Sequence, residues 1–126
     1  MRPISTKTHT IIGLVVGVVL IAAPWIFGFN DVAEAMLSAV LVGAFIILNE
    51  LITTSPYGLV KLVPMRVHLA IDVVTGLFLA LSPWLFGFSG AAANVWVPHL
   101  IVGIMTIGYA LMTSTADDTA PASVKA

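Results

Sequence analysis

A histidine and an aspartate stand four positions apart at the start of a long apolar segment, as His68 and Asp72. Residues with this spacing lie about one turn apart on the same face of a helix, so the imidazole and the carboxylate are expected to pair. A carboxylate in the apolar part of a membrane is costly unless it is paired or neutralised, and such residues often mark a functional site. Asp72 is therefore the strongest functional candidate in the sequence.

Three further polar residues are expected at the depth of this pair. The candidate polar layer consists of His9, Asn49, Glu50, His68 and Asp72. Imidazoles and carboxylates in one layer can relay protons or hold a divalent cation. In the alternative interpretation the same groups only hold helices together. Asp72 then pairs with His68 or Arg66, while Glu50 pairs with Lys61. The chain contains no His-Glu-x-x-His pattern, so the sequence by itself assigns no metal site.

Other kinds of reactive site are absent from the sequence. There is no cysteine, which excludes disulfides, thiolate metal sites and thiol catalysis. The chain also lacks a phosphate-binding glycine loop, a nucleophile elbow and a histidine motif for covalently bound haem. The net charge is −1 and there is no cluster of Lys and Arg, which argues against nucleic acid as a partner. We therefore predict that the protein is not an enzyme and carries no cofactor.

Hydrophobic residues make up 60% of the chain and charged residues only 9%, a balance that a soluble domain of this size could not bury. The apolar residues fall into runs long enough to cross a bilayer as helices. The predicted membrane spans cover approximately residues 10–29, 33–53, 67–88 and 94–112. The lipid bilayer is therefore the first predicted partner.

The basic residues mark one side of the membrane. All five Lys and Arg residues lie in the N-terminal segment, in the connector between the second and third spans, or in the tail: Arg2, Lys7, Lys61, Arg66 and Lys125. Because Lys and Arg are enriched in cytoplasmic segments, both termini are predicted to be cytoplasmic. Residues 114–126 are rich in Ala, Thr, Asp and Ser, and are predicted to form a disordered cytoplasmic tail.

The phrase Pro-Trp-x-Phe-Gly-Phe occurs at residues 24–29 and again at residues 83–88. The ungapped alignment of the two phrases also matches His9 with His68. One inserted residue then brings Val42-Gly43 onto Val102-Gly103 in the second spans. This self-similarity predicts two tandem units, residues 1–59 and 60–113.

Because each predicted unit crosses the membrane twice, both copies have the same orientation and are expected to be related by a pseudo-two-fold axis along the membrane normal. The predicted fold is an all-α bundle of four transmembrane helices. Small residues recur at four-residue intervals, as in Gly13-x-x-x-Gly17 and Gly76-x-x-x-Ala80, and such ridges let membrane helices approach closely.

The sequence Ser82-Pro83-Trp84 resembles the SPW repeat of small bacterial membrane proteins, with Ala23 in the place of the serine in the first copy. The resemblance implies the two-helix unit and a location in the bacterial plasma (inner) membrane. It brings no established catalytic or binding residues. The repeat motif consists of Pro24, Trp25, Phe27, Gly28, Phe29, Ser82, Pro83, Trp84, Phe86, Gly87 and Phe88.

Each motif residue type has an expected physical role. Proline cannot donate a backbone hydrogen bond, so Pro24 and Pro83 are expected to kink their helices or to end them about one turn earlier. Ser82 can bond back to its own helix there, which Ala23 cannot. The tryptophans are expected to anchor the helix ends at the membrane interface, and the glycines to allow the turn into the next span.

Two functions remain open at this point. In the first, the protein is a structural or accessory interaction subunit, as a homo-oligomer or within a larger membrane complex. In the alternative, it transports or senses protons or small cations through the polar layer near the cytoplasmic side.

Overall fold

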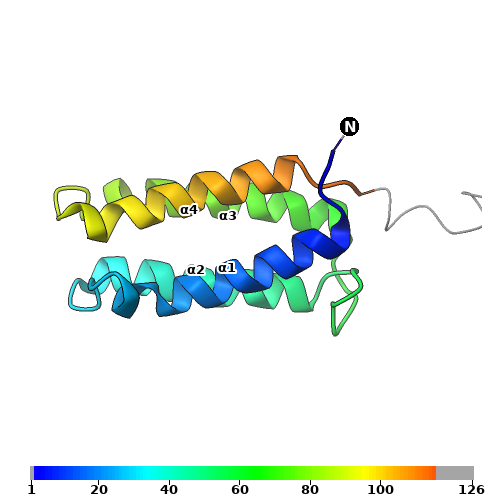
Figure 1. Cartoon of the computed structure of the whole chain (residues 1–126), viewed down its shortest axis with the longest axis horizontal. Helices are drawn as coiled ribbons and strands as arrows, with labels where there is room; N and C mark the ends of the chain where they lie inside the picture. Colours follow the sequence, from blue (N-terminus) through cyan, green and yellow to red (C-terminus); the bar gives the residue numbers. More distant parts are fainter. Residues whose placement is uncertain (1, 116–126) are drawn as a thin grey trace, which may run out of the picture.

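The computed structural model describes residues 2–115, which form four helices joined by short segments. These are α1 (Thr6–Ile26), α2 (Ala33–Leu51), α3 (Met65–Leu85) and α4 (Ala93–Leu111). Figure 1 shows two helical hairpins lying side by side, α1 with α2 and α3 with α4. The turns inside the hairpins lie at one end of the bundle. The N-terminus and the connector between α2 and α3 lie at the other end.

All four helices are long and apolar enough to cross a membrane, which confirms the predicted all-helical membrane fold. Their bounds differ from the predicted spans by a few residues. The first helix begins at Thr6 rather than at residue 10 because the Ser5 side chain caps it, accepting a hydrogen bond from Thr8 N–H at 3.1 Å. The predicted tail lies, from residue 116 onward, outside the described residues.

Glycines let the two helices of each hairpin pack with their backbones close together. A Cβ atom built on Gly43 would lie 2.7 Å from the carbonyl oxygen of Gly17, and one built on Gly76 would lie 2.7 Å from that of Gly103. No real side chain fits in such a space. The predicted small-residue ridges are therefore helix contacts in both hairpins, as in other membrane helix pairs.

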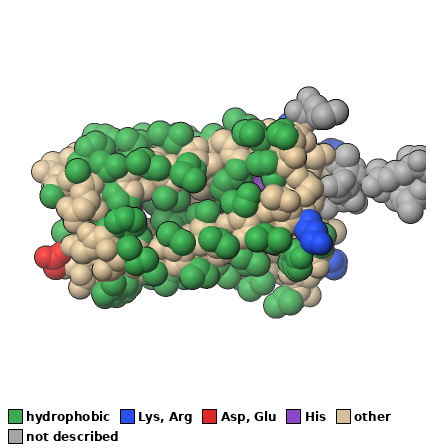
Figure 2. Space-filling model, viewed as in Figure 1, with side chains coloured by type: hydrophobic (Ala, Val, Ile, Leu, Met, Phe, Trp, Pro, Cys, Tyr) green, Lys and Arg blue, Asp and Glu red, His purple; other side chains and the backbone are tan. Residues whose placement is uncertain are grey.

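The outer surface of the bundle is apolar along most of its length, as Figure 2 shows, with acidic side chains at one end and basic side chains at the other. Exposed large hydrophobic residues occur on every helix; examples are Val18, Leu41, Val74 and Ile104. Large apolar faces of this kind are stable in lipid rather than in water. The basic end is the end with the N-terminus and the α2–α3 connector.

The repeat motif ends both first helices in the same way. Gly28 and Gly87 have φ angles of 74° and 77°, in the left-handed region, and the next residue donates its N–H back to the proline carbonyl at 2.8 Å in each copy. This is the hydrogen bond that a Schellman cap makes. The glycines therefore make the predicted turn.

The prolines are expected to kink their helices or to end them about one turn earlier, and the second of these expectations is wrong. Pro24 and Pro83 lie within the last turn of α1 and α3, which continue to Ile26 and Leu85. Proline removes only the hydrogen bond from its own nitrogen to the carbonyl oxygen four residues earlier, that of Leu20 in α1 and of Leu79 in α3, and the few residues that follow it can stay helical. In α3, Ser82 Oγ donates to Leu79 O at 2.7 Å, the carbonyl that Pro83 cannot serve.

The aromatic residues of the motif divide into two groups. Trp25 and Trp84 are 60% and 53% exposed, whereas Phe29 and Phe88 are buried in the main apolar core. The tryptophans lie near the turn end of the hairpins, where an indole suits the boundary between lipid and water. Phe27 and Phe86 are exposed as well, so each copy of the motif presents two aromatic rings to the surroundings and buries a third in the core between the hairpins.

Candidate functional site

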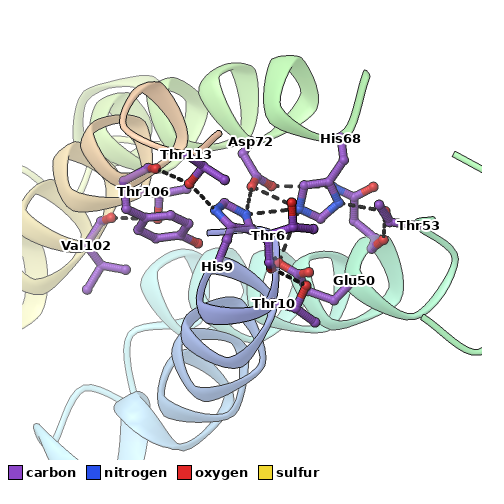
Figure 3. A network of polar contacts seen from close by, with 12 residues as sticks. Thr6, His9, Thr10, Glu50, Thr53, His68, Asp72, Val102, Thr106 and Thr113 are labelled. Carbon is purple, nitrogen blue, oxygen red and sulfur yellow. Dashed lines mark hydrogen bonds and ion pairs between the residues drawn. The ribbon is translucent and has the colours of Figure 1, made fainter. Parts of the chain in front are cut away.

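Three helices bring two histidines and two carboxylates together at the basic end of the bundle. We call this set, His9 from α1, Glu50 from α2 and His68 and Asp72 from α3, the His–carboxylate cluster. One ligand atom from each side chain lies within 4.8 Å of the others, and all four residues are at most 1% exposed. Figure 3 shows the side chains converging in the interior.

The two imidazole rings face each other through their Nε2 atoms, which are 3.2 Å apart. Asp72 Oδ2 lies 2.8 Å from Nε2 of His9 and 3.1 Å from Nε2 of His68. Glu50 Oε1 lies 3.6 Å and 3.2 Å from the same two atoms. Each nitrogen is therefore within 3.6 Å of both carboxylates.

Asn49, the fifth member of the predicted polar layer, supports the cluster from α2. Its Nδ2 donates to Asp72 Oδ1 at 3.3 Å, which leaves Oδ2 directed at the histidines. The structure thus brings together all five residues of the predicted layer.

One predicted pairing is wrong. Lys61 does not reach Glu50, because its Nζ donates to the carbonyl oxygen of Ser55 at 2.7 Å and its side chain lies on the surface of the connector. Arg66 is exposed as well, and Asp72 pairs with the two histidines. The buried carboxylates therefore face the histidines of the cluster and not the surface cations.

Two threonines that the sequence analysis missed hold the histidines from behind. Thr113 Oγ1 lies 2.8 Å from Nδ1 of His9, and Thr53 Oγ1 lies 2.6 Å from Nδ1 of His68. Each hydroxyl donates its one hydrogen to the carbonyl oxygen four residues earlier, Thr113 to Tyr109 and Thr53 to Asn49. Because the hydroxyl hydrogen is used in this way, the oxygen accepts a hydrogen bond from the ring N–H.

These contacts determine the tautomer of both rings. With the hydrogen on Nδ1, a neutral imidazole has a lone pair on Nε2. In the neutral form both lone pairs point toward each other and toward the carboxylate oxygens, whereas a ring that carries a second hydrogen donates it from Nε2 to a carboxylate. Nitrogen and oxygen atoms that can act as ligands therefore lie close together at the centre of the cluster.

Glu50 is the least satisfied member of the cluster. Neither of its carboxylate oxygens has a hydrogen-bond partner among the described residues, although the side chain is fully buried. The side chain reaches this place because α1 has a glycine opposite it: a Cβ on Gly13 would overlap Glu50 Oε1. A buried carboxylate without a donor is unstable unless a cation compensates it.

The pairing of each histidine with a threonine of the other hairpin repeats in the two halves of the chain. The sequence alignment that matches Val42-Gly43 with Val102-Gly103 also matches Thr53 with Thr113. This match was the signal that could have revealed the threonines. Both lie just beyond the ends of α2 and α4, whereas the predicted boundaries make Thr53 the last residue of a span and Thr113 the last residue of the second unit.

The third histidine lies outside the cluster, toward the other end. His99 is buried between the rings of Phe29 and Phe88, with ring centroids 5.2 Å and 4.8 Å away, and its Nε2 lies 2.9 Å from Ala35 O. It is a core residue. Its partners are backbone carbonyls, in contrast to the carboxylates around His9 and His68.

The comparisons with known proteins agree with the architecture. The model of the SPW repeat domain matches residues 7–113, which include all of the His–carboxylate cluster and both copies of the Pro-Trp motif. No curated protein and no solved structure matches the chain. The match covers most of the sequence and agrees with four apolar helices of membrane-spanning length. The protein therefore belongs to the SPW repeat family and is a membrane protein.

Proposed function

We propose that this protein is not an enzyme and serves as a structural or accessory subunit of the membrane, either as a homo-oligomer or in a larger complex. The observation that carries the proposal is that the polar centre of the bundle is closed to solvent. The four side chains of the His–carboxylate cluster are at most 1% exposed and contact one another. A catalytic site needs a cavity into which the substrate fits, and the burial of these four side chains within the described residues leaves almost none of their surface for a substrate to contact.

The cluster then serves to join the hairpins. Within each hairpin, the helices pack through glycine contacts, whereas α2 and α3 and especially α1 and α4 approach each other less closely. Polar contacts cross this boundary from His9 to Asp72 and from Thr53 to His68. In lipid, polar contacts between helices are a main source of association, since the apolar surfaces gain little by leaving lipid.

The exposed aromatic residues at the turn end are the proposed contact surface for a partner or a second copy. Trp25, Phe27, Trp84 and Phe86 are all at least 45% exposed. Aromatic residues are enriched both at protein interfaces and at the membrane boundary.

The test is affinity purification of the full chain in a mild detergent, followed by determination of its mass in the detergent micelle. Self-association or recovery with a membrane partner is expected, and Trp25→Ala with Trp84→Ala should weaken it. Val18→Ala and Val74→Ala, which remove exposed aliphatic side chains far from the turns, serve as controls. Recovery of the protein only as a monomer without a partner would contradict the proposal.

We further propose that the protein lies in the bacterial plasma membrane with both termini in the cytoplasm. The basic residues at one end of the bundle support this orientation. Because the chain has no cysteine, Ala92→Cys in an outer turn and Val60→Cys in the connector would each introduce a unique thiol. In intact spheroplasts, a membrane-impermeant thiol reagent should label only position 92. Labelling of position 60 alone would contradict the proposal and show that the connector lies on the outer side of the membrane.

A second candidate function is proton or small-cation sensing or transport, and the convergence of the two Nε2 atoms with two carboxylates favours it. The interior beyond the cluster is filled by apolar residues such as Leu20, Leu79, Phe29 and Phe88, which favours binding and sensing over a continuous path. Liposomes with an internal pH dye test transport by comparing the parent with Asp72→Asn and His68→Ala, with His99→Ala as the control. An identical proton leak in all four would exclude proton transport.

A further inference from the structure

We infer that the His–carboxylate cluster binds one divalent transition metal ion, with Zn²⁺ as the ion that fits it best. The ligands are Nε2 of His9, Nε2 of His68, and one carboxylate oxygen each from Glu50 and Asp72. This inference goes beyond the subunit role and rests on the second candidate function, for which it names the cation.

Five of the six distances among the donor atoms lie close to those of a tetrahedral site, and the sixth, between the two carboxylate oxygens, is within 4.8 Å. Zinc binds imidazole nitrogen and carboxylate oxygen at about 2.0–2.2 Å, so adjacent ligand atoms of a tetrahedron lie about 3.4 Å apart. The five nitrogen–nitrogen and nitrogen–oxygen distances in the cluster are 3.2, 3.6, 2.8, 3.2 and 3.1 Å. A metal ion at the centre therefore requires shifts of only a few tenths of an ångström in most ligands.

The histidines are prepared for metal binding by the threonines behind them. Metal-bound histidine usually donates its other ring N–H to a fixed acceptor, which orients the ring and determines the tautomer. Thr113 and Thr53 supply this acceptor for His9 and His68, at 2.8 Å and 2.6 Å. Asn49 supports Asp72 in the same manner through Oδ1. Three of the four ligands are thus held by a second residue.

The charge of the cluster also calls for a divalent cation. Two carboxylates are buried beside the two histidines, and neither oxygen of Glu50 has a hydrogen-bond partner within the described chain. An M²⁺ ion balances two carboxylates and gives the free oxygen of Glu50 a partner beside it. The donor set of two imidazoles and two carboxylates suits zinc and its neighbours in the first transition series, whereas magnesium and calcium prefer six or more oxygen ligands.

Two protons shared among the same four groups would give the same net charge, so the experiment must separate protons from metal. The full chain, purified in mild detergent, is treated with a chelator, freed of it, and loaded with Zn²⁺ or Co²⁺. One Zn²⁺ per chain is expected by elemental analysis. Bound Co²⁺ should show the strong visible absorption of four-coordinate cobalt. The absence of uptake, or the weak spectrum of six-coordinate cobalt, would overturn the inference without the need for any variant.

Matched variants locate the site. Glu50→Gln and Asp72→Asn keep the size of the side chain and remove its charge, and each should weaken Zn²⁺ binding by about 100-fold or more, beyond the loss from a supporting residue. The controls are Glu34→Gln and Asp31→Asn, which make the same changes in exposed carboxylates at the opposite end. Equal uptake by the Glu50→Gln/Asp72→Asn double variant and the parent would overturn the inference.

The threonines are positioning residues and have their own test. Thr53→Val and Thr113→Val should each weaken Zn²⁺ binding by about 10- to 100-fold. They should also shift the visible spectrum of the cobalt form, which a merely structural role would leave unchanged. Thr106→Val is the matched control, because its hydroxyl bonds to Val102 O and not to a histidine.

The result is separable from the tests of the proposed function. Metal uptake is measured on detergent-solubilised protein without a membrane potential, a pH gradient or a partner. Zinc binding without self-association would remove the subunit role and keep the metal site. Self-association without zinc binding would support the subunit role and overturn the metal site.

Discussion

The carboxylate of Glu50 occupies the space that a side chain at Gly13 would need: a Cβ at that glycine would overlap Oε1 and lie 2.7 Å from Cδ. In the alignment of the two units, Gly13 corresponds to Asp72, and Glu50 corresponds to Ala110. The first hairpin therefore supplies its carboxylate from its second helix and the second hairpin from its first helix. Each hairpin has a small residue at the position where the other has the acid.

Gly13→Ala is expected to displace the Glu50 side chain, lower the free energy of unfolding by about 1–3 kcal/mol and weaken Zn²⁺ binding. Gly108→Ala is the control, because a Cβ on this helical glycine meets no described atom within 4 Å. In a Glu50→Ala background the cost of Gly13→Ala should largely vanish, since the two effects share one contact. Thermal unfolding in detergent measures the change in stability, and metal titration measures the change in Zn²⁺ affinity. An equal cost in the two backgrounds would refute the steric relationship.

Removal of the metal should destabilise the folded chain. At a free Zn²⁺ concentration about 100 times the dissociation constant, binding contributes about 2.7 kcal/mol to stability, and a chelator should abolish this contribution. The unfolding temperature of the parent should therefore fall when the chelator is added. The Glu50→Gln/Asp72→Asn variant should show no such change. A chelator effect of the same size in both proteins would point to another site.

Gly103→Ala should separate α3 from α4. The added Cβ would lie 2.5 Å from the backbone nitrogen of Ala80 and 2.6 Å from Gly76 O, and backbone atoms cannot move aside as a side-chain end can. We expect a loss of about 1–3 kcal/mol in unfolding free energy. Gly108→Ala in the same helix should be neutral or slightly stabilising, since alanine favours the helix. If the two variants unfold alike, the close contact does not contribute to stability.

Gly28→Ala and Gly87→Ala should each cost about 1–2 kcal/mol, because both glycines have left-handed backbone angles that an L-residue adopts at this cost. Gly90→Ala in the turn between α3 and α4 is the control. The two losses should add in the double variant, since a Cβ added at either glycine meets no described atom within 4 Å and the two substitutions therefore share no contact. Equilibrium unfolding monitored by circular dichroism gives the values. A cost no larger than that of Gly90→Ala would show that the turns tolerate a side chain.

Ser82→Ala should leave the buried Leu79 carbonyl without its donor, at a cost of about 1 kcal/mol or somewhat more. In a Pro83→Ala background, the restored backbone N–H can serve Leu79 O, and Ser82→Ala should then cost little. Ser38→Ala is the control, because Ser38 bonds to Glu34 O in a helix that contains no proline. A double-mutant cycle of unfolding free energies tests the coupling. Additive effects of Ser82→Ala and Pro83→Ala would disprove it.

The helices and their immersion in lipid were predictable because they depend on local composition. Runs of apolar residues of membrane-spanning length, bounded by charges, predicted four helices, and the structure has them within a few residues of the predicted bounds. The helical period also placed His68 and Asp72 on one buried face. The last turns were less predictable: a proline was expected to kink the helix or to end it about one turn earlier, but so close to the helix end it removes only the one hydrogen bond to the carbonyl four residues before it.

What the tertiary structure decided is which polar groups meet. The sequence could place Glu50 near the level of the histidines, but only the rotation and spacing of α1 and α2 decide that it fits against Gly13 and faces His68 rather than Lys61. Thr53 and Thr113 are unremarkable in sequence and become partners of histidines only because the other hairpin lies beside them. The apolar composition of each segment is enough to predict a membrane helix. The hydrogen-bond partners of the histidines and the proposed cation site depend on contacts between helices, which the order of residues in the chain does not specify.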